Sequence, residues 1–123
     1  KIYGTGTSRI TVIGVKKLHK LSYRIMPDRI EAGTFLCAAA ISKGKIQING
    51  ANPEDMMSTL YTLRKSGCKI TIKQNAIRLI APNELKEISV ETNPYPEFPT
   101  DMQPILGAML TKTLGTSEIT ENI

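Results

Sequence analysis

The sequence predicts an α+β fold built from repeated strand-helix-strand-helix-strand-strand (βαβαββ) units, with one full and one partial unit. Short stretches in which Ile alternates with polar residues recur between segments that have the apolar spacing of helices. In addition, Pro27-Asp28 precedes one predicted helix and Pro99-Thr100-Asp101 precedes another. Because a Gly and an Ile-bearing strand follow each of these two helices, the pattern indicates an internal repeat.

The first repeat begins with a short extended segment at 23–26, because the proline that follows disfavours a helix there. A helix is predicted over 29–42. Asp28 is placed to cap its start, and Glu31 lies three residues on, at the spacing of a capping box. A half-buried strand is predicted over 45–49.

The second helix of this repeat is predicted to begin at Asn52-Pro53 and to end before Gly67. A capping Asn, a proline at the first helical position and a terminal glycine are typical of helix boundaries. Segments 68–73 and 76–80 then alternate apolar and polar residues, and Gln74-Asn75 is suited to a two-residue turn between them. These features predict a β-hairpin.

The second repeat is incomplete. Its predicted elements are a strand at 85–91, an extended polyproline-like loop at 93–99, a helix at 100–114 and a strand at 116–123. A further strand is predicted earlier in the chain, at 9–15. Because repeat units bury their faces against neighbours, we expect the chain to be a fragment of a longer protein or to form an oligomer.

Charge is concentrated at one end of the chain. The net charge is +5, and residues 1–27 contain six basic residues and no acidic one. Such an end indicates either a phosphate-bearing partner or a solvated face. The longest apolar run, Phe35–Ile41, is far shorter than the roughly 20 residues of a membrane-spanning helix. Two Cys and one His are too few to form a zinc site by themselves.

Asp101 is the strongest candidate for acid–base chemistry. A stiff loop would hold its carboxylate in a fixed place, and a general base must lie about 3 Å from the proton it removes. The alternative is a helix N-cap. Pro104 favours this alternative, because a proline in the first turn implies that the helix starts at Met102 or later. The residues alone leave both roles open.

Four other residues are weaker candidates for a site. Asp28 is expected to be a helix cap, and Arg29 beside it is suited either to a phosphate or carboxylate ligand or to pairing with Glu or solvent. Cys37 and Cys68 have no neighbouring His or cation cluster that would lower a thiol pKa. Neither Cys is therefore assigned as a nucleophile.

Four segments resemble the enolpyruvyl transferase family, and within it the branch that starts bacterial peptidoglycan synthesis. The first and third are long and specific. They are Pro27–Phe35, Leu63–Gly67, Pro94–Gln103 and Ile119–Ile123. The resemblance runs from about Arg9 to Ile123 and covers the middle of the family's length.

This resemblance implies two lobes, each an inside-out α/β barrel of three βαβαββ units, with the active site between them. Residues 1–26 would be the closing strand region of one lobe and the crossover. Residues 27–123 would be part of the other lobe, with one unit at about 23–81 and a truncated unit at about 85–123. The implied reaction transfers the enolpyruvyl group of phosphoenolpyruvate to the 3-hydroxyl of UDP-N-acetylglucosamine. It takes place in the cytoplasm, without a metal or organic cofactor.

The resemblance also implies roles for individual residues. Asp101 falls on the family's Pro-Thr-Asp aspartate, which binds the sugar 3-hydroxyl and is the proposed base. Ile123 falls on a position whose backbone contacts the UDP-sugar. Asp28 and Arg29 match a Pro-Asp-Arg motif between the lobes, as hinge or cleft residues. Pro104 stands where another residue is usual, which leaves the direction of Asp101 open.

Other parts of the family's machinery have no counterpart in this sequence. The loop with the reactive Cys, the Lys-Asn pair and the phosphate-binding arginines are missing, so we expect the isolated chain to be inactive. The alternative is a non-catalytic RNA- or phosphate-binding module of the same repeat type. The few aromatic residues weigh against nucleic acid. We expect no nucleic-acid or membrane partner, and leave self-association through the truncated face as an option.

Overall fold

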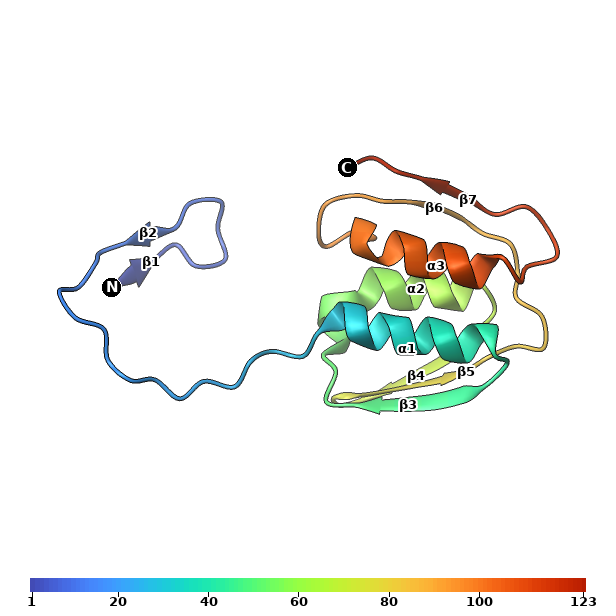
Figure 1. The fold of residues 1–123 in the computed structure, drawn as a ribbon, viewed down its shortest axis with the longest axis horizontal. Coiled ribbons are helices and arrows are strands. Elements are labelled where there is room, and N and C mark those ends of the chain that lie inside the picture. The colour runs from blue at the N-terminus through green and yellow to red at the C-terminus, as the bar shows by residue number, and fades with distance from the viewer.

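A computed structural model describes residues 1–123 and shows three helices between two small sheets (Figure 1). The helices are α1 (Arg29–Ile41), α2 (Met57–Lys65) and α3 (Gln103–Leu110). Short 3₁₀ turns at Pro53–Met56 and Thr100–Met102 lead into α2 and α3. All three helices begin at the same end of the body (Figure 1). The predicted α+β class is confirmed.

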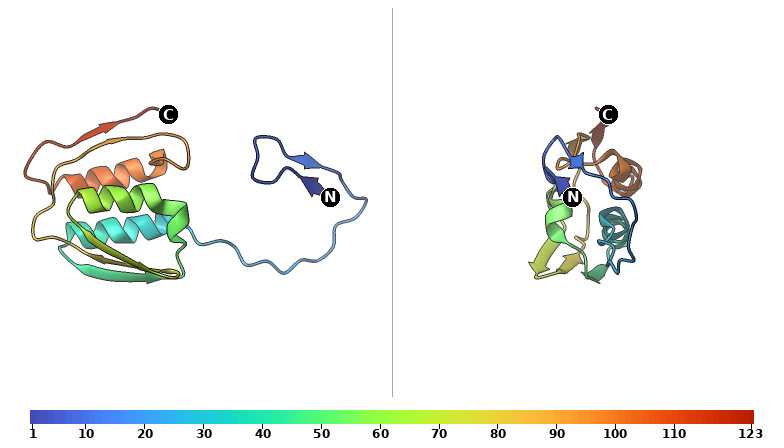
Figure 2. Two further views of the ribbon diagram at one scale, coloured as in Figure 1. Left: turned by 180° about the vertical axis from the view of Figure 1, so that it is seen from behind. Right: turned by 90° about the vertical axis from the view of Figure 1, so that its left-hand side faces the viewer.

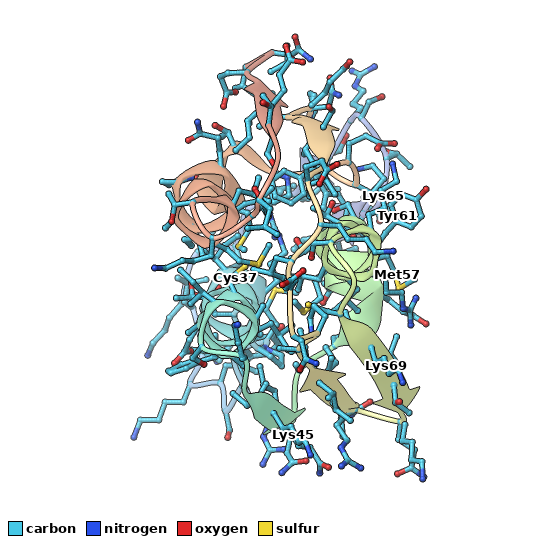
Figure 3. The ribbon with its side chains drawn as sticks, turned by 90° about the vertical axis from the view of Figure 1, so that its right-hand side faces the viewer. Cys37, Lys45, Met57, Tyr61, Lys65 and Lys69 are labelled. Atoms are coloured by element: carbon cyan, nitrogen blue, oxygen red, sulfur yellow. The ribbon has the colours of Figure 1, made fainter.

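The sheet below α1 and α2 is antiparallel, in the order β3-β5-β4. It comprises β3 (Lys45–Asn49), β4 (Lys69–Lys73) and β5 (Ala76–Ile80). The register pairs Ile48 and Ile72 with the buried Ile77 of the central strand. Side chains alternate between the two faces of a strand, so Lys45 and Lys69 project into solvent (Figure 3). One face of the sheet is therefore apolar and packs against the core, and the other is polar and faces solvent.

The second sheet is a parallel pair of β6 (Ser89–Glu91) and β7 (Glu118–Thr120), which lies beyond α3. The core between the sheets contains 19 buried apolar residues. Gly33 lies on the face of α1 that meets the start of α3, where a Cβ atom would come within 2.7 Å of the Met102 sulfur. A glycine at this position lets the two segments approach closely.

Residues 1–27 form an arm that extends away from the body, as the left-hand view of Figure 2 also shows. Its only regular structure is the two-residue pair of β1 (Ile2–Tyr3) with β2 (Thr11–Val12). All of its large apolar side chains are exposed, and Leu18 is 86% accessible. The arm makes no contribution to the core. No helix in the structure is both long and apolar enough to cross a lipid bilayer.

Several predicted elements are confirmed with small changes of boundary. α1 ends one residue before the predicted end, and the strand at 45–49 and the hairpin are as expected. In the hairpin turn, Gln74 has a φ of 48°, the left-handed conformation that a tight turn requires. The helix predicted after Asn52 begins as a 3₁₀ turn before continuing as α2.

Other predicted elements are wrong or too long. The strand at 9–15 is reduced to Thr11–Val12, and 23–26 forms no strand, because neither segment has neighbouring backbone to complete a ladder. The strand at 85–91 is regular only from Ser89. The helix at 100–114 ends at Leu110, and the strand at 116–123 covers only Glu118–Thr120.

The two cysteines are part of the core. Cys37 faces α3 from α1 (Figure 3) and is 3% exposed, and Cys68 is also buried. Burial, with a smaller effect of the nearby Cys68, raises the pKa of the Cys37 thiol to about 12. Burial also raises the pKa of Cys68, although the Ser66 hydroxyl at 3.8 Å partly opposes this change. These thiols are structural, as the sequence predicts.

The cap on α1 provides a test of local stability. The Asp28 carboxylate accepts hydrogen bonds from the N–H groups of Ile30 at 2.7 Å and Glu31 at 3.2 Å. Asp28→Ala removes both bonds and is expected to lower the free energy of unfolding by about 1 kcal/mol. Asp28→Asn keeps an acceptor oxygen and should lower the free energy of unfolding by only a few tenths of the loss in Asp28→Ala. Urea denaturation at pH 7 measures both, and equal losses would contradict the capping role.

The cysteines provide a test of the core. At pH 8 neither Cys37 nor Cys68 is expected to react with a disulfide reagent such as DTNB, because both are buried and protonated. In urea both should react within the mixing time. Rapid modification of one thiol in the folded chain would show that its side of the core is open.

Candidate active site

One cavity of about 640 Å³ lies at the common starting end of the three helices. Its lining comes from the end of the arm at Met26 and Pro27, the start of α1, the 3₁₀ turn before α2, and the loop and 3₁₀ turn before α3. The polar lining residues are Asp28, Arg29, Asp55, Tyr95 and Asp101. The structure thus brings together three of the four residues proposed from the sequence. The positive ends of the helix dipoles favour acidic side chains at this position.

The Asp101 carboxylate lies on the wall of this cavity and has no hydrogen-bond partner in the chain. The residue is exposed and lies in the 3₁₀ turn Thr100–Met102. The interpretation of Asp101 as a helix cap is wrong, because the N–H groups of Met102 and Gln103 already donate to the carbonyls of Pro99 and Thr100. The carboxylate is therefore free to accept a hydrogen bond from a ligand.

Pro104 is accommodated without disturbing this turn. It is the second residue of α3, in the first turn, where the missing N–H of proline has no helical partner to lose. The prediction that the helix starts at Met102 or later is confirmed, since α3 begins at Gln103. Pro104 itself is absent from the cavity lining.

The loop that carries Asp101 is folded back on itself and is not the extended polyproline segment that its prolines predict. Asn93 N–H donates to the Phe98 carbonyl at 3.0 Å, and Glu97 N–H donates to the Pro94 carbonyl at 3.1 Å. The Tyr95-Pro96 peptide is cis. Phe98 is buried in the core, and the Ser58 hydroxyl on α2 donates to the Glu97 carbonyl at 3.1 Å. These contacts anchor the loop to the body.

Arg29 and Tyr95 also line the cavity. The Arg29 guanidinium carbon lies 5.4 Å from the centre of the Tyr95 ring, within the range of a cation–π interaction. The Arg29 Nε atom is buried and has no hydrogen-bond partner. This contact joins the start of α1 to the proline-rich loop. Asp28 uses its carboxylate mainly to cap α1.

Ile123 lies outside the cavity lining, in the exposed segment after β7. Its N–H donates to the Glu121 carboxylate at 3.1 Å. The same carboxylate accepts the hydroxyl hydrogens of Thr92 at 2.6 Å and Thr100 at 2.8 Å. The bonds from Thr92 first, and then from Thr100, lower the pKa of Glu121 below its usual value. Ile123 is thereby linked to the residue before Asp101.

Sequence reasoning missed Asp55, Tyr95 and Glu121. In the sequence, Asp55 cannot be distinguished from other acidic residues in a first helical turn. In the structure its carboxylate accepts a hydrogen bond from the Asn52 side chain at 2.9 Å. Tyr95 is one of two aromatic residues between the prolines, beside the buried Phe98, and an exposed aromatic side chain next to a candidate base is a usable signal. Glu121 lies far from Thr92 and Thr100 in sequence, so only the fold reveals their contact. No group of three or more His, Cys, Asp or Glu side chains is arranged to hold a metal ion.

Comparisons with known proteins show the family of the chain. Residues 1–123 match the family described as EPSP synthase (3-phosphoshikimate 1-carboxyvinyltransferase). A protein of Novosphingobium aromaticivorans named UDP-N-acetylglucosamine 1-carboxyvinyltransferase is 46% identical over the whole chain, which covers 29% of that protein. A protein of the same name from Kosmotoga olearia is also 46% identical, over the same shares. The chain thus spans under a third of the length of these relatives.

A solved structure shows the same fold. The enolpyruvyl transferase NikO from Streptomyces tendae superposes with a TM-score of 0.68 at 18% identity, over 79% of this chain and 23% of NikO. The resemblance found in the sequence is confirmed. The chain belongs to the EPSP synthase family of enolpyruvyl transferases.

Proposed function

We propose that this chain is part of a transferase that moves the enolpyruvyl group of phosphoenolpyruvate to the 3-hydroxyl of UDP-N-acetylglucosamine. Phosphate is released in this reaction, which is the first committed step of peptidoglycan synthesis and takes place in the cytoplasm. The identity to proteins named UDP-N-acetylglucosamine 1-carboxyvinyltransferase supports this substrate pair. The observation that carries the proposal is the unpaired Asp101 carboxylate on the wall of a cavity large enough for a sugar.

In this proposal Asp101 is the general base. As the 3-hydroxyl oxygen of the sugar attacks C2 of phosphoenolpyruvate, Asp101 takes the hydroxyl proton and an acid outside the 123 residues protonates C3 of phosphoenolpyruvate, which gives a tetrahedral intermediate. A base outside the 123 residues then removes a proton from this C3, the C2–C3 double bond forms again, and the C2–O bond breaks so that phosphate leaves. A base must lie in hydrogen-bond reach of the proton it removes, and a carboxylate without a partner in the protein meets this requirement.

The charges around the cavity fit the sugar better than the phosphates. Three carboxylates and one guanidinium line it, from Asp28, Asp55, Asp101 and Arg29. Carboxylates accept hydrogen bonds from hydroxyl groups and repel phosphate oxygens. We therefore place the hydroxyl end of the substrate against this wall. The phosphates would bind elements outside the 123 residues.

We also propose that the chain is divided between two lobes. Residues 1–26 would belong to the closing strand region of one lobe and the crossover, and 27–123 to the second lobe, with units at about 23–81 and 85–123. The exposed apolar side chains of the arm support this division, because such residues normally pack against a partner. Asp28 and Arg29 would then lie at the hinge, on the wall of the cleft between the lobes.

The base can be tested in the complete enzyme with Asp101→Asn. This change keeps size and polarity but removes the proton acceptor, so turnover should fall by about 10²- to 10⁴-fold. Because Asp101 accepts no hydrogen bond from the chain, the free energy of unfolding should change by less than about 0.5 kcal/mol. Phosphate release and urea denaturation measure the two quantities. A variant with full turnover would eliminate Asp101 as the base.

The isolated 123-residue chain is expected to release no phosphate from phosphoenolpyruvate and UDP-N-acetylglucosamine above a protein-free blank. One cation lines the cavity, so the chain offers too little charge to stabilise a departing phosphate. The complete enzyme at equal concentration is the positive control. Turnover by the isolated chain that Asp101→Asn abolishes would show that the remaining parts are dispensable.

A further inference from the structure

The Glu121 carboxylate joins three segments that meet beside the cavity. One oxygen accepts from the Thr92 hydroxyl at 2.6 Å and the Ile123 N–H at 3.1 Å, and the other accepts from the Thr100 hydroxyl at 2.8 Å. Thr92 also accepts a hydrogen bond from the Asn122 N–H at 3.0 Å. We call Thr92, Thr100, Glu121, Asn122 and Ile123 the Glu121 network. Both carboxylate oxygens are used, which fixes the orientation of the group.

This network closes the base of the loop that positions Asp101. Thr92 and Thr100 flank residues 93–99, so one carboxylate holds both ends of the loop. Thr92 is fully buried, which gives the network a rigid attachment to the body. Thr100 is adjacent to Asp101, within the same 3₁₀ turn. A displacement of Thr100 therefore changes the direction of the Asp101 side chain.

The strength of these bonds suits a positioning role. Hydrogen bonds from neutral donors to an ionised carboxylate are shorter and stronger than those between neutral groups. Backbone bonding holds only the Thr92 end of the loop to β7, where the Thr92 N–H donates to the Thr120 carbonyl at 2.9 Å, and no backbone hydrogen bond joins β7 to the 3₁₀ turn of Asp101. The side chain of Glu121 thus supplies the link between the end of β7 and the turn of Asp101.

We propose that Glu121 is a positioning residue of the transfer reaction. It orients Asp101 by holding the Thr100 hydroxyl, and it orients the Ile123 backbone by accepting the Ile123 N–H. This inference rests on the proposed function, in which Asp101 removes the proton of the sugar hydroxyl. Glu121 itself touches no reacting atom. Its effect is on the placement of the base relative to the substrate, where an error of about 1 Å can cost about 100-fold in rate.

The test uses four single variants of the complete enzyme. Glu121→Ala removes the network, and Thr100→Val removes only its link to Asp101. Both should lower kcat by about 10- to 100-fold, with the KM for phosphoenolpyruvate unchanged within about threefold. Thr100→Ser restores the hydroxyl and should restore most of kcat. Glu118→Ala removes from β7, three residues before Glu121, a carboxylate that makes no hydrogen bond, and should match the unmodified enzyme.

A double-mutant cycle with Asp101→Asn separates positioning from general stability. If Glu121 acts through Asp101, adding Glu121→Ala or Thr100→Val to Asp101→Asn should change kcat by no more than about twofold. The inference would be overturned if either change lowered kcat in Asp101→Asn by the same factor as in the unmodified enzyme. It would also be overturned if Glu121→Ala and Thr100→Val alone both kept the kcat of the unmodified enzyme. If Glu121→Ala gives no cooperative melting transition, Thr100→Val and Thr100→Ser at the exposed turn still decide the question.

The outcomes also separate this inference from the proposed function. Full turnover by Asp101→Asn would refute the role of Asp101, whatever the Glu121 variants do. A large loss in Asp101→Asn together with normal kcat in Glu121→Ala and Thr100→Val would leave the function intact and refute the positioning role alone.

Discussion

The common origin of three helices at one end of the body is the constraint on which the site depends. Each start is set by its own local chemistry: the Asp28 side-chain cap for α1, the proline of the 3₁₀ turn for α2, and the Thr100–Met102 turn for α3. Apolar packing then holds the three in parallel, with Leu36, Leu60 and Leu106 almost fully buried. Because helix starts collect acidic residues and leave N–H groups free, aligning them gathers polar groups at one place.

Strong local signals explain what could be predicted from the sequence. The cap at Asp28, Pro53 at a helix start and the Gln74-Asn75 turn each act within a few residues, so the elements around them are as expected. The sequence allows Asp101 to be a base or a cap, and the structure excludes the cap. The strands predicted at 9–15 and 23–26 are wrong except for Thr11–Val12, because a strand depends on partners that the sequence pattern does not contain.

The proline-rich loop shows a different limit. Three prolines predict stiffness, and the loop is indeed well anchored, but its shape comes from the Glu97–Pro94 turn, the buried Phe98 and the contact with α2. Local rigidity and long-range contacts thus act together. The Glu121 network adds a further long-range link, between residues about 20 to 30 positions apart. Such a contact has no periodic signature in the sequence.

The close approach of Gly33 to Met102 has a consequence for how this protein can vary. Met102 follows Asp101 directly, and its sulfur occupies the space that any larger residue at position 33 would need. A larger side chain at the buried position 33 would therefore displace Met102 and, through it, the neighbouring carboxylate, although Gly33 does not line the cavity. Substitutions in the core around position 33 and substitutions in the turn that holds Asp101 therefore constrain one another.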